Sequence, residues 1–228
     1  MAGDDRDVII IGPQGSGKGT QAAIVAPELG LVHISVGDLF REVMASDSEL
    51  GRLLTGYVNH GELVPDDLTI RMLFKRLDAL KAEQPSVRGA LLDGFPRNQA
   101  QAEALDRALA ERGDHLTAVV HLVVPHDVLL QRLSGRLLCK VCGATYHAVL
   151  NPPKNPPFCD VCRNELYQRS DDTPEAVERR LKIYYDQTKP VLARYAKAGL
   201  VIEIDGNRPI NDVTKEILVA LRPRVEVG

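Results

Sequence analysis

The stretches Asp7-Val-Ile-Ile-Ile-Gly12 and Gly12-Pro-Gln-Gly-Ser-Gly-Lys-Gly-Thr20 decide the fold class. The first is a β-branched apolar run that ends in glycine, which is typical of a buried strand. The second opens a predicted helix, and this context is what a phosphate-binding loop requires. Glycines let backbone N–H groups converge on phosphate oxygens, the helix N-terminus adds its dipole, and Lys18 supplies a mobile charge. A glycine-rich turn without a ligand is the alternative, because Gly19 separates Lys18 from Thr20.

Four further apolar runs predict four more buried strands, and amphipathic stretches between them predict helices. The strands are expected over residues 31–34, 89–93, 117–124 and 200–204. The helices are expected over residues 17–29, 68–83, 98–112, 126–135 and 174–198. Alternation of this kind predicts an α/β fold in which helices cover both faces of a five-stranded parallel sheet.

Two segments interrupt the alternation. Residues 35–64 carry helical patterns of their own, whereas residues 135–172 contain the four cysteines and the proline-rich run Asn151-Pro-Pro-Lys-Asn-Pro-Pro157. We therefore predict a core domain made of residues 1–34, 65–134 and 173–228, with a helical insertion and a cysteine-containing insertion.

Charge and hydropathy restrict the function class. The 228 residues carry 28 basic and 31 acidic side chains, a net charge of −3, so no basic surplus favours nucleic-acid binding. The leader MAGDDRD lacks the pattern of a secretory signal. No apolar run approaches the ~20 residues that a membrane helix needs. We expect a soluble, cytoplasmic protein, and disulfides are not expected in that reducing compartment.

Two C-x-x-C knuckles, Cys139-Lys-Val-Cys142 and Cys159-Asp-Val-Cys162, predict a metal site. Their spacing is that of a tetrahedral zinc ribbon, and four thiolates leave no open position for water, so the zinc would be structural. A segment this small cannot bury enough apolar surface to fold alone, and metal binding would supply the missing stabilisation. Redox cysteines are the alternative, and iron or cobalt also accepts four thiolates.

The segment Leu91-Leu-Asp-Gly-Phe-Pro-Arg97 ends the third strand at the sheet edge where α/β proteins bind ligands. Asp93 is suited to holding Mg²⁺ through waters, and Arg97 to binding a phosphate. Other arginines could converge on polyphosphate and offset its charge during phosphoryl transfer, although each alone could be a surface charge. The set is Arg41, Arg97, Arg132, Arg136, Arg169 and Arg180. A phosphate acceptor is already anionic, so no general base is required.

With these motifs in hand, residues 7 to 221 resemble the long-lid bacterial adenylate kinases of the P-loop nucleoside monophosphate kinase family. That family's phosphate loop includes the glycine between lysine and threonine, which accounts for Gly19. The resemblance makes residues 35–64 the NMP-binding domain and residues 135–172 the zinc-containing lid. It implies that ATP is bound by Gly15, Ser16, Gly17, Lys18, Gly19, Thr20, Arg132, Arg136, Thr145, Tyr146 and, through its backbone, Arg208.

The same resemblance implies an AMP site in which Gln101 recognises the adenine edge. The implied AMP contacts are Val36, Arg41, Glu62, Leu63, Val64, Gly94, Phe95, Pro96, Arg97, Gln101, Arg169 and Arg180. It also implies catalytic roles for Lys18, Arg97, Arg132, Arg136, Arg169 and Arg180, and ties from Asp171 and Asp172 to the lid arginines. Two positions depart from the family pattern: Val36 stands where threonine is common, and Gln14 where proline is common.

The expected reaction is therefore reversible, Mg²⁺-dependent transfer, ATP + AMP ⇌ 2 ADP, by a monomer. Val36 leaves open another nucleotide pair, such as GTP with AMP or ATP with a pyrimidine monophosphate. A zinc-ribbon binding module on an ATPase scaffold is the alternative from a different class. His33 and His121 lie in predicted strands and are expected to be satisfied core or rim groups.

Overall fold

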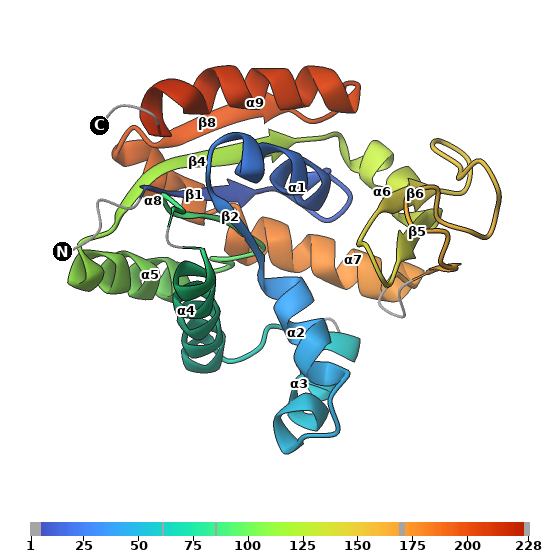
Figure 1. Ribbon diagram of the computed structural model, residues 1–228, viewed down its shortest axis with the longest axis horizontal. Helices are drawn as coiled ribbons and strands as arrows, with labels where there is room; N and C mark the ends of the chain where they lie inside the picture. The colour runs from blue at the N-terminus through green and yellow to red at the C-terminus, as the bar shows by residue number, and fades with distance from the viewer. Residues whose placement is uncertain (1–5, 61, 85, 169–171, 226–228) are drawn as a thin grey trace.

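Five parallel strands form the centre of the molecule (Figure 1). The computed structural model describes residues 6–60, 62–84, 86–168 and 172–225. The strands are β1 (Arg6–Ile11), β2 (Val32–Ser35), β3 (Ala90–Asp93), β4 (His115–Val123) and β8 (Val201–Asp205), in the order β2-β3-β1-β4-β8. All four pairings are parallel, so the predicted sheet and fold class are confirmed.

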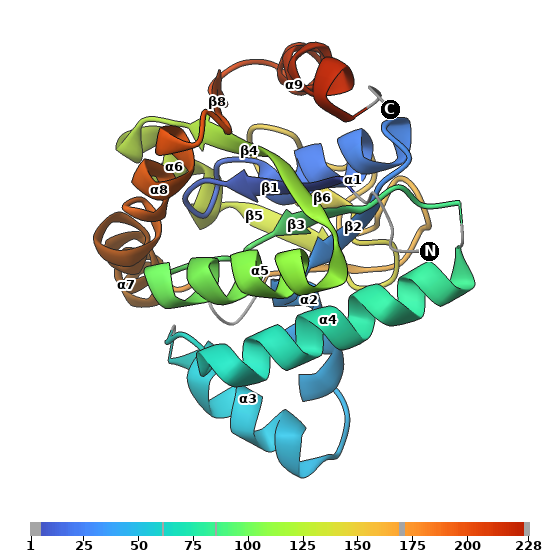
Figure 2. The same cartoon turned by 90° about the vertical axis from the view of Figure 1, so that its left-hand side faces the viewer.

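Helices cover both faces of this sheet, as Figures 1 and 2 show. Successive side chains of β1 point to opposite faces, and each face packs in its own apolar cluster. Val8 and Ile10 pack with α1 (Lys18–Glu28) and α9 (Ile210–Val225). Ile9 and Ile11 share a cluster with α4 (Asp66–Glu83), α5 (Gln99–Arg112) and α8 (Val191–Lys197).

The C-terminal third differs from the sequence prediction in two ways. The single helix expected over residues 174–198 is wrong: α7 (Pro174–Ile183) passes into a π-helical turn, η1 (Tyr184–Thr188), before α8 begins. Pro190 has no N–H to donate, so the helical hydrogen bonding is interrupted there, although Lys189 before it keeps helical dihedral angles. Helix α9 was not predicted, although its buried residues Val213, Ile217, Leu221 and Val225 recur every four positions.

The two insertions are built differently. Residues 35–64 contain α2 (Val36–Met44) and α3 (Glu49–Asn59). Each helix is capped by a serine, with Ser35 Oγ accepting the N–H of Asp38 and Ser48 Oγ accepting that of Gly51. Helix α6 (His126–Ser134) leads into a separate antiparallel sheet of order β6-β5-β7, made of β5 (Arg136–Cys139), β6 (Thr145–His147) and β7 (Leu166–Tyr167). Within the described ranges, no helix has the length and apolar character needed to span a bilayer.

Candidate active site

The phosphate loop connects β1 to α1 through backbone that requires glycine. Gly15 and Gly17 have φ values of 80° and 94°, in the left-handed region that side chains disfavour. A Cβ at Gly12 would lie only 2.7 Å from Ser16 Oγ. Lys18 begins α1 and folds back over the loop, donating to the Pro13 carbonyl at 2.9 Å. The sequence therefore produces a strand, a tight cradle and a helix N-terminus in immediate succession.

Ser16 supports the cradle interpretation. Its side chain is buried, and its Oγ makes no hydrogen bond to any residue that the structure describes. A hydroxyl costs free energy when it is buried without a partner, and such groups cluster where a ligand completes the bonding. The hydroxyl can donate to a phosphate oxygen, so this loop fits the group predicted for it.

Cationic side chains distant in sequence converge on Lys18. Burial, the largest cause, together with the nearby guanidinium groups of Arg97, Arg180 and Arg136, lowers the pKa of Lys18 to about 8, against the opposing effect of Asp93. These groups come from the β3–α5 loop, α7 and the first strand of the lid. Four of the six residues predicted to be catalytic, Lys18, Arg97, Arg136 and Arg180, therefore interact electrostatically at the phosphate loop.

Arg132 lies at the other side of the phosphate loop. Its Nη1 donates to the carbonyls of Gly206 at 3.0 Å and Gly15 at 3.4 Å, and its Nη2 to Asn207 Oδ1 at 3.4 Å. It therefore connects the loop to residues 205–209, where Arg208 is held by the Glu216 carboxylate. Arg132 and Arg208 are both close to the region predicted for ATP, and their contacts with a nucleotide stay predictions.

Asp93 ends β3 where three strands terminate together. It is in register with Ile10 of β1 and Ser35 of β2. A Cβ at Gly19 would lie 3.4 Å from its Oδ2, so the carboxylate faces the start of α1. Carboxylate oxygen is a ligand that Mg²⁺ accepts, directly or through water. The donor chemistry fits the predicted role at this position.

A cleft of about 590 Å³, including its open mouth, lies beside β3. Its lining residues are Val36, Gly37, Phe40, Arg41, Val58, Glu62, Leu63, Val64, Thr69, Gly94, Arg97, Gln101 and Arg180. Most of the residues predicted to bind AMP are among them. Phe95 and Pro96 are not: the Phe95 ring is buried in the core cluster, and neither residue lines this cleft.

Local contacts hold the polar residues of the cleft. Arg41 Nε donates to Asp38 Oδ1 at 3.1 Å, one turn earlier on α2. Arg97 Nε donates to the Gly94 carbonyl at 2.8 Å, across a turn that places Gly94 at a φ of 79°. Both guanidinium groups are therefore oriented by a residue three positions earlier, Arg41 by a side-chain carboxylate and Arg97 by a backbone carbonyl.

A buried carboxylate connects the lid to α7. Asp172 Oδ2 accepts the Nε–H of Arg136 at 2.9 Å, and the second carboxylate oxygen pairs with the Arg136 Nη2 as well. Arg180 Nη1 lies 3.6 Å from the same Oδ1. The expected tie from Asp172 to the lid arginines is present. Arg169 and Asp171, which were given related roles, lie outside the described residues.

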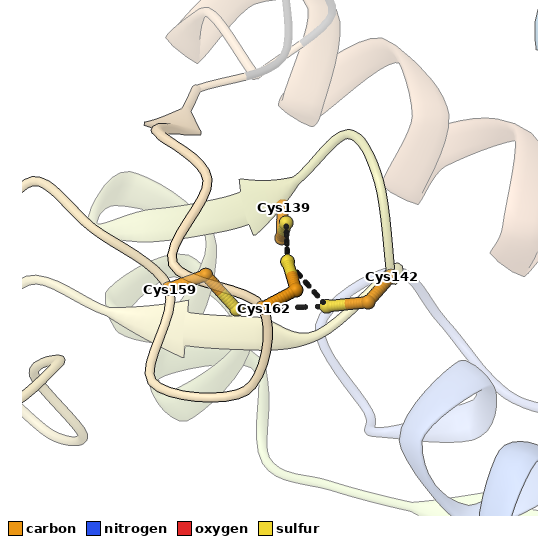
Figure 3. A group of neighbouring side chains, drawn as sticks. All are labelled: Cys139, Cys142, Cys159 and Cys162. Carbon is orange, nitrogen blue, oxygen red and sulfur yellow. Dashed lines mark hydrogen bonds between the residues drawn. The ribbon is translucent and has the colours of Figure 1, made fainter.

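The four cysteines converge, as Figure 3 shows. Their Sγ atoms all lie within 4.8 Å of one another, with 3.3 Å between Cys139 and Cys162 and 3.5 Å between Cys142 and Cys159. A disulfide requires about 2.05 Å. Sulfurs at Zn–S distances of ~2.3 Å in a tetrahedron stand about 3.8 Å apart. The donor set and its spacing therefore fit one zinc ion better than two disulfides.

Thr145 and Tyr146 face different ways. Thr145 is exposed, whereas the Tyr146 ring packs in the interior of the lid. The Tyr146 hydroxyl accepts the Asp160 N–H at 2.9 Å and lies 3.5 Å from Cys159 Sγ. Thr145 is thus the member of the pair with a side chain at the surface.

The predicted core histidines have different environments. His121 fulfils the expectation, since its Nδ1 lies 3.0 Å from Glu203 Oε1 and its Nε2 lies 3.0 Å from the Tyr184 hydroxyl. Burial lowers the pKa of this histidine. The expectation is wrong for His33, whose Nε2 lies 3.7 Å from Asp93 Oδ2 and has no hydrogen-bond partner among the described residues.

Three residues that contact the site were not predicted from sequence. Thr188 Oγ1 donates to the Arg97 carbonyl at 2.8 Å. Asp66 accepts a hydrogen bond from the Gln101 amide. His147 Nε2 donates to the Gln131 carbonyl of α6 at 2.9 Å, while its Nδ1 accepts two backbone N–H groups. No local motif contains the first two pairs, because they join segments 91 and 35 residues apart in the chain.

Comparison with known proteins agrees with this geometry. A family model described as adenylate kinase matches residues 10–200. This chain belongs to the adenylate kinase family. The adenylate kinase of Moorella thermoacetica is 48% identical over 215 residues, covering 94% of this chain and 97% of the relative. Those of Caldanaerobacter subterraneus and Carboxydothermus hydrogenoformans are each 47% identical, covering 94% of this chain and 95% and 99% of their own.

The family membership confirms the resemblance drawn from the motifs. As a member of the adenylate kinase family, the chain is an ATP:AMP phosphotransferase.

Proposed function

We propose that this enzyme catalyses reversible, Mg²⁺-dependent transfer, ATP + AMP ⇌ 2 ADP, with ATP on the phosphate loop and AMP in the cleft beside β3. The observation that carries the assignment is the convergence of Arg97, Arg136 and Arg180 on Lys18, between the loop and the cleft. Fixed cations at this point offset the negative charge that two nucleotides bring together.

The residues of the chain contribute mainly by binding and orientation. Loop N–H groups and the α1 N-terminus hold the ATP phosphates, and Lys18 stabilises the negative charge of the transferred phosphoryl group. Arg97 and Arg41 hold the AMP phosphate, which is itself the nucleophile, so no side chain has to remove a proton. Mg²⁺ bound near Asp93 through water would neutralise part of the phosphate charge when present.

Residues 35–64 and 135–172 are proposed to close over AMP and ATP respectively. Closure excludes water, which would otherwise divert transfer into hydrolysis. Asp172 supports this scheme because it holds Arg136 of the lid and approaches Arg180 of α7. We further propose that Arg169, Thr145 and the backbone of Arg208 complete the nucleotide contacts.

Cys139, Cys142, Cys159 and Cys162 are proposed to bind a structural zinc ion. Their thiolates form a closed tetrahedral set, and the zinc would stabilise the lid without entering the reaction. We also propose that the enzyme works as a cytoplasmic monomer, with ATP, AMP and ADP as its partners and without nucleic acid or membrane.

A nucleotide panel tests the assignment. Coupled assays should give the highest kcat/KM for AMP among monophosphates and for ATP among donors, with negligible phosphate release when no acceptor is added. A preference for a pyrimidine monophosphate or for GTP would favour another nucleotide pair. Val36→Thr is the informative variant, because it adds the hydroxyl common in the family at a buried position that lines the cleft.

A further inference from the structure

The side-chain amide of Gln101 is held in one orientation. Its Oε1 accepts the backbone N–H of Arg97 at 2.7 Å, and its Nε2 donates to Asp66 Oδ1 at 2.7 Å. A backbone N–H only donates and a carboxylate only accepts, so these two partners identify the oxygen and nitrogen ends of the amide. Gln101 is 2% exposed and lines the cleft proposed for AMP.

Asp66 is itself positioned by the start of α5. Asn98 Nδ2 donates to the same Asp66 Oδ1 at 3.1 Å, while Asn98 Oδ1 accepts the Gln101 backbone N–H at 2.8 Å as the cap of that helix. Asp66 is the first residue of α4. The beginnings of two helices are thereby joined around one amide, and the acceptor facing Gln101 has a fixed location.

We propose that Asp66 is a positioning residue that determines base selectivity by preventing the Gln101 amide from turning over. A glutamine amide without such partners can rotate by half a turn and exchange its donor for its acceptor. Here the rotated amide would direct its NH₂ group at the Arg97 N–H and its oxygen at the Asp66 carboxylate. The first contact would place a donor against a donor and the second an acceptor against an acceptor, which leaves buried polar groups unsatisfied.

The fixed amide has one unused acceptor position on Oε1 and one unused N–H on Nε2. Adenine presents an amino donor at C6 and an acceptor at N1, which this pair complements. Hypoxanthine and guanine present the reverse, an oxygen acceptor at C6 and an N1–H donor. The inference rests on the proposed function, in which AMP occupies this cleft and its base meets Gln101. Val36 lines the same cleft with an apolar side chain and cannot supply this discrimination.

The test compares AMP with IMP as acceptors, because IMP reverses the donor and acceptor pattern without adding bulk. Asp66→Ala removes the acceptor. Asp66→Ser also removes it, because the serine hydroxyl is one bond shorter than the carboxylate, but it keeps a residue type that suits a helix start. Asp66→Asn keeps an oxygen acceptor in place. Asp67→Ala is the matched control, because Asp67 occupies the same first turn of α4 but pairs with Arg71 at the surface.

The ratio of kcat/KM for AMP to that for IMP should fall at least about tenfold in Asp66→Ala and Asp66→Ser, mainly through KM. It should stay near the wild-type ratio in Asp66→Asn and Asp67→Ala. A purely structural defect would lower kcat/KM for both acceptors and leave the ratio unchanged. An unchanged ratio in Asp66→Ala and Asp66→Ser, or an equal fall in Asp67→Ala, would overturn the inference. A wild-type enzyme that did not prefer AMP would instead refute the proposed function.

Discussion

The two insertions into the core obtain their stability in different ways. In residues 35–64 the buried side chains Val36, Phe40, Leu54 and Val64 belong to the same apolar cluster as the core strands. The lid has a separate cluster of four buried residues, Cys139, Tyr146, Cys159 and Leu166, of which two are candidate metal ligands. Several apolar lid side chains, such as Val149 and Phe158, remain exposed. The first insertion thus extends the core, whereas the proposed zinc would compensate for the small interior of the lid.

Loss of the proposed metal site should show the largest difference in stability between the two insertions. Cys159→Ser removes a fully buried member of the proposed zinc site, so we expect less than one zinc per chain, a lid that melts early and at least a hundredfold loss of kcat. Structural zinc contributes about 10–16 kcal/mol to folding in zinc-finger peptides, which makes this the largest expected effect. Metal analysis, calorimetry and the coupled assay provide the measurements.

The matched control is Val161→Ala, which lies between the two cysteines of the same knuckle and is 73% exposed. It should retain zinc and activity. If wild-type protein contained well under one zinc per chain, or if chelation left the lid transition unchanged, the metal-dependent account of the lid would be wrong.

Leu54→Ala tests the opposite behaviour in residues 35–64. Leu54 is fully buried in the cluster shared with the core, so its truncation should lower the free energy of unfolding of the whole protein by about 2–5 kcal/mol. Denaturant unfolding should show one transition that moves as a unit. The neighbouring Leu53 is 49% exposed, and Leu53→Ala should change stability by less than about 0.5 kcal/mol. A separate early transition in Leu54→Ala would show that this insertion folds independently.

Asp172→Asn tests how the lid is connected to the core. The substitution keeps the volume of the side chain but removes the charge that faces Arg136 and Arg180. Hydrogen bonds to charged groups contribute about 1.5–3 kcal/mol, so we expect a moderate loss of stability and a roughly tenfold fall in kcat. Zinc content should not change, which distinguishes this variant from the cysteine substitution.

Asp186→Asn is the control for that experiment. Asp186 pairs with Lys182 at the surface of the segment that follows α7, where an ion pair contributes little. Its kcat and stability should match those of the wild type. An Asp172→Asn enzyme with unchanged kcat would show that the carboxylate does not orient the catalytic arginines.

Local sequence patterns predicted features of both insertions. The cysteine knuckles and the phosphate loop are contiguous patterns, so residue type and spacing alone indicated their chemistry. The two short helices of residues 35–64 were visible in the apolar pattern. Contacts such as Asp66 with Gln101 and Thr188 with Arg97 depend on how distant segments pack, and no local pattern encodes them. The interruption before Pro190 was missed because the apolar periodicity continues on both sides of it.

The last effect concerns Lys18, whose pKa is shifted by burial and by cations from both the core and the lid. Burial, together with Arg97, Arg180 and Arg136, lowers the pKa of Lys18 from 10.5 to about 8. Between these two values the unfolded chain binds more protons at this position than the folded chain. The contribution of Lys18 to the free energy of unfolding therefore rises as the pH increases from about 8 to about 10.5.

ATP binding should reverse this shift, because phosphate charge favours the protonated amine. Above pH 8 the Kd for ATP should rise by up to about tenfold per pH unit, and binding should take up as much as one proton per site. Calorimetry in buffers of different ionisation enthalpy measures the uptake. Lys18→Arg keeps its charge throughout this range, so its weaker binding should lose the pH dependence. A wild-type Kd that stays flat from pH 7 to pH 10 would show that the cations of the lid and cleft do not act on Lys18 together.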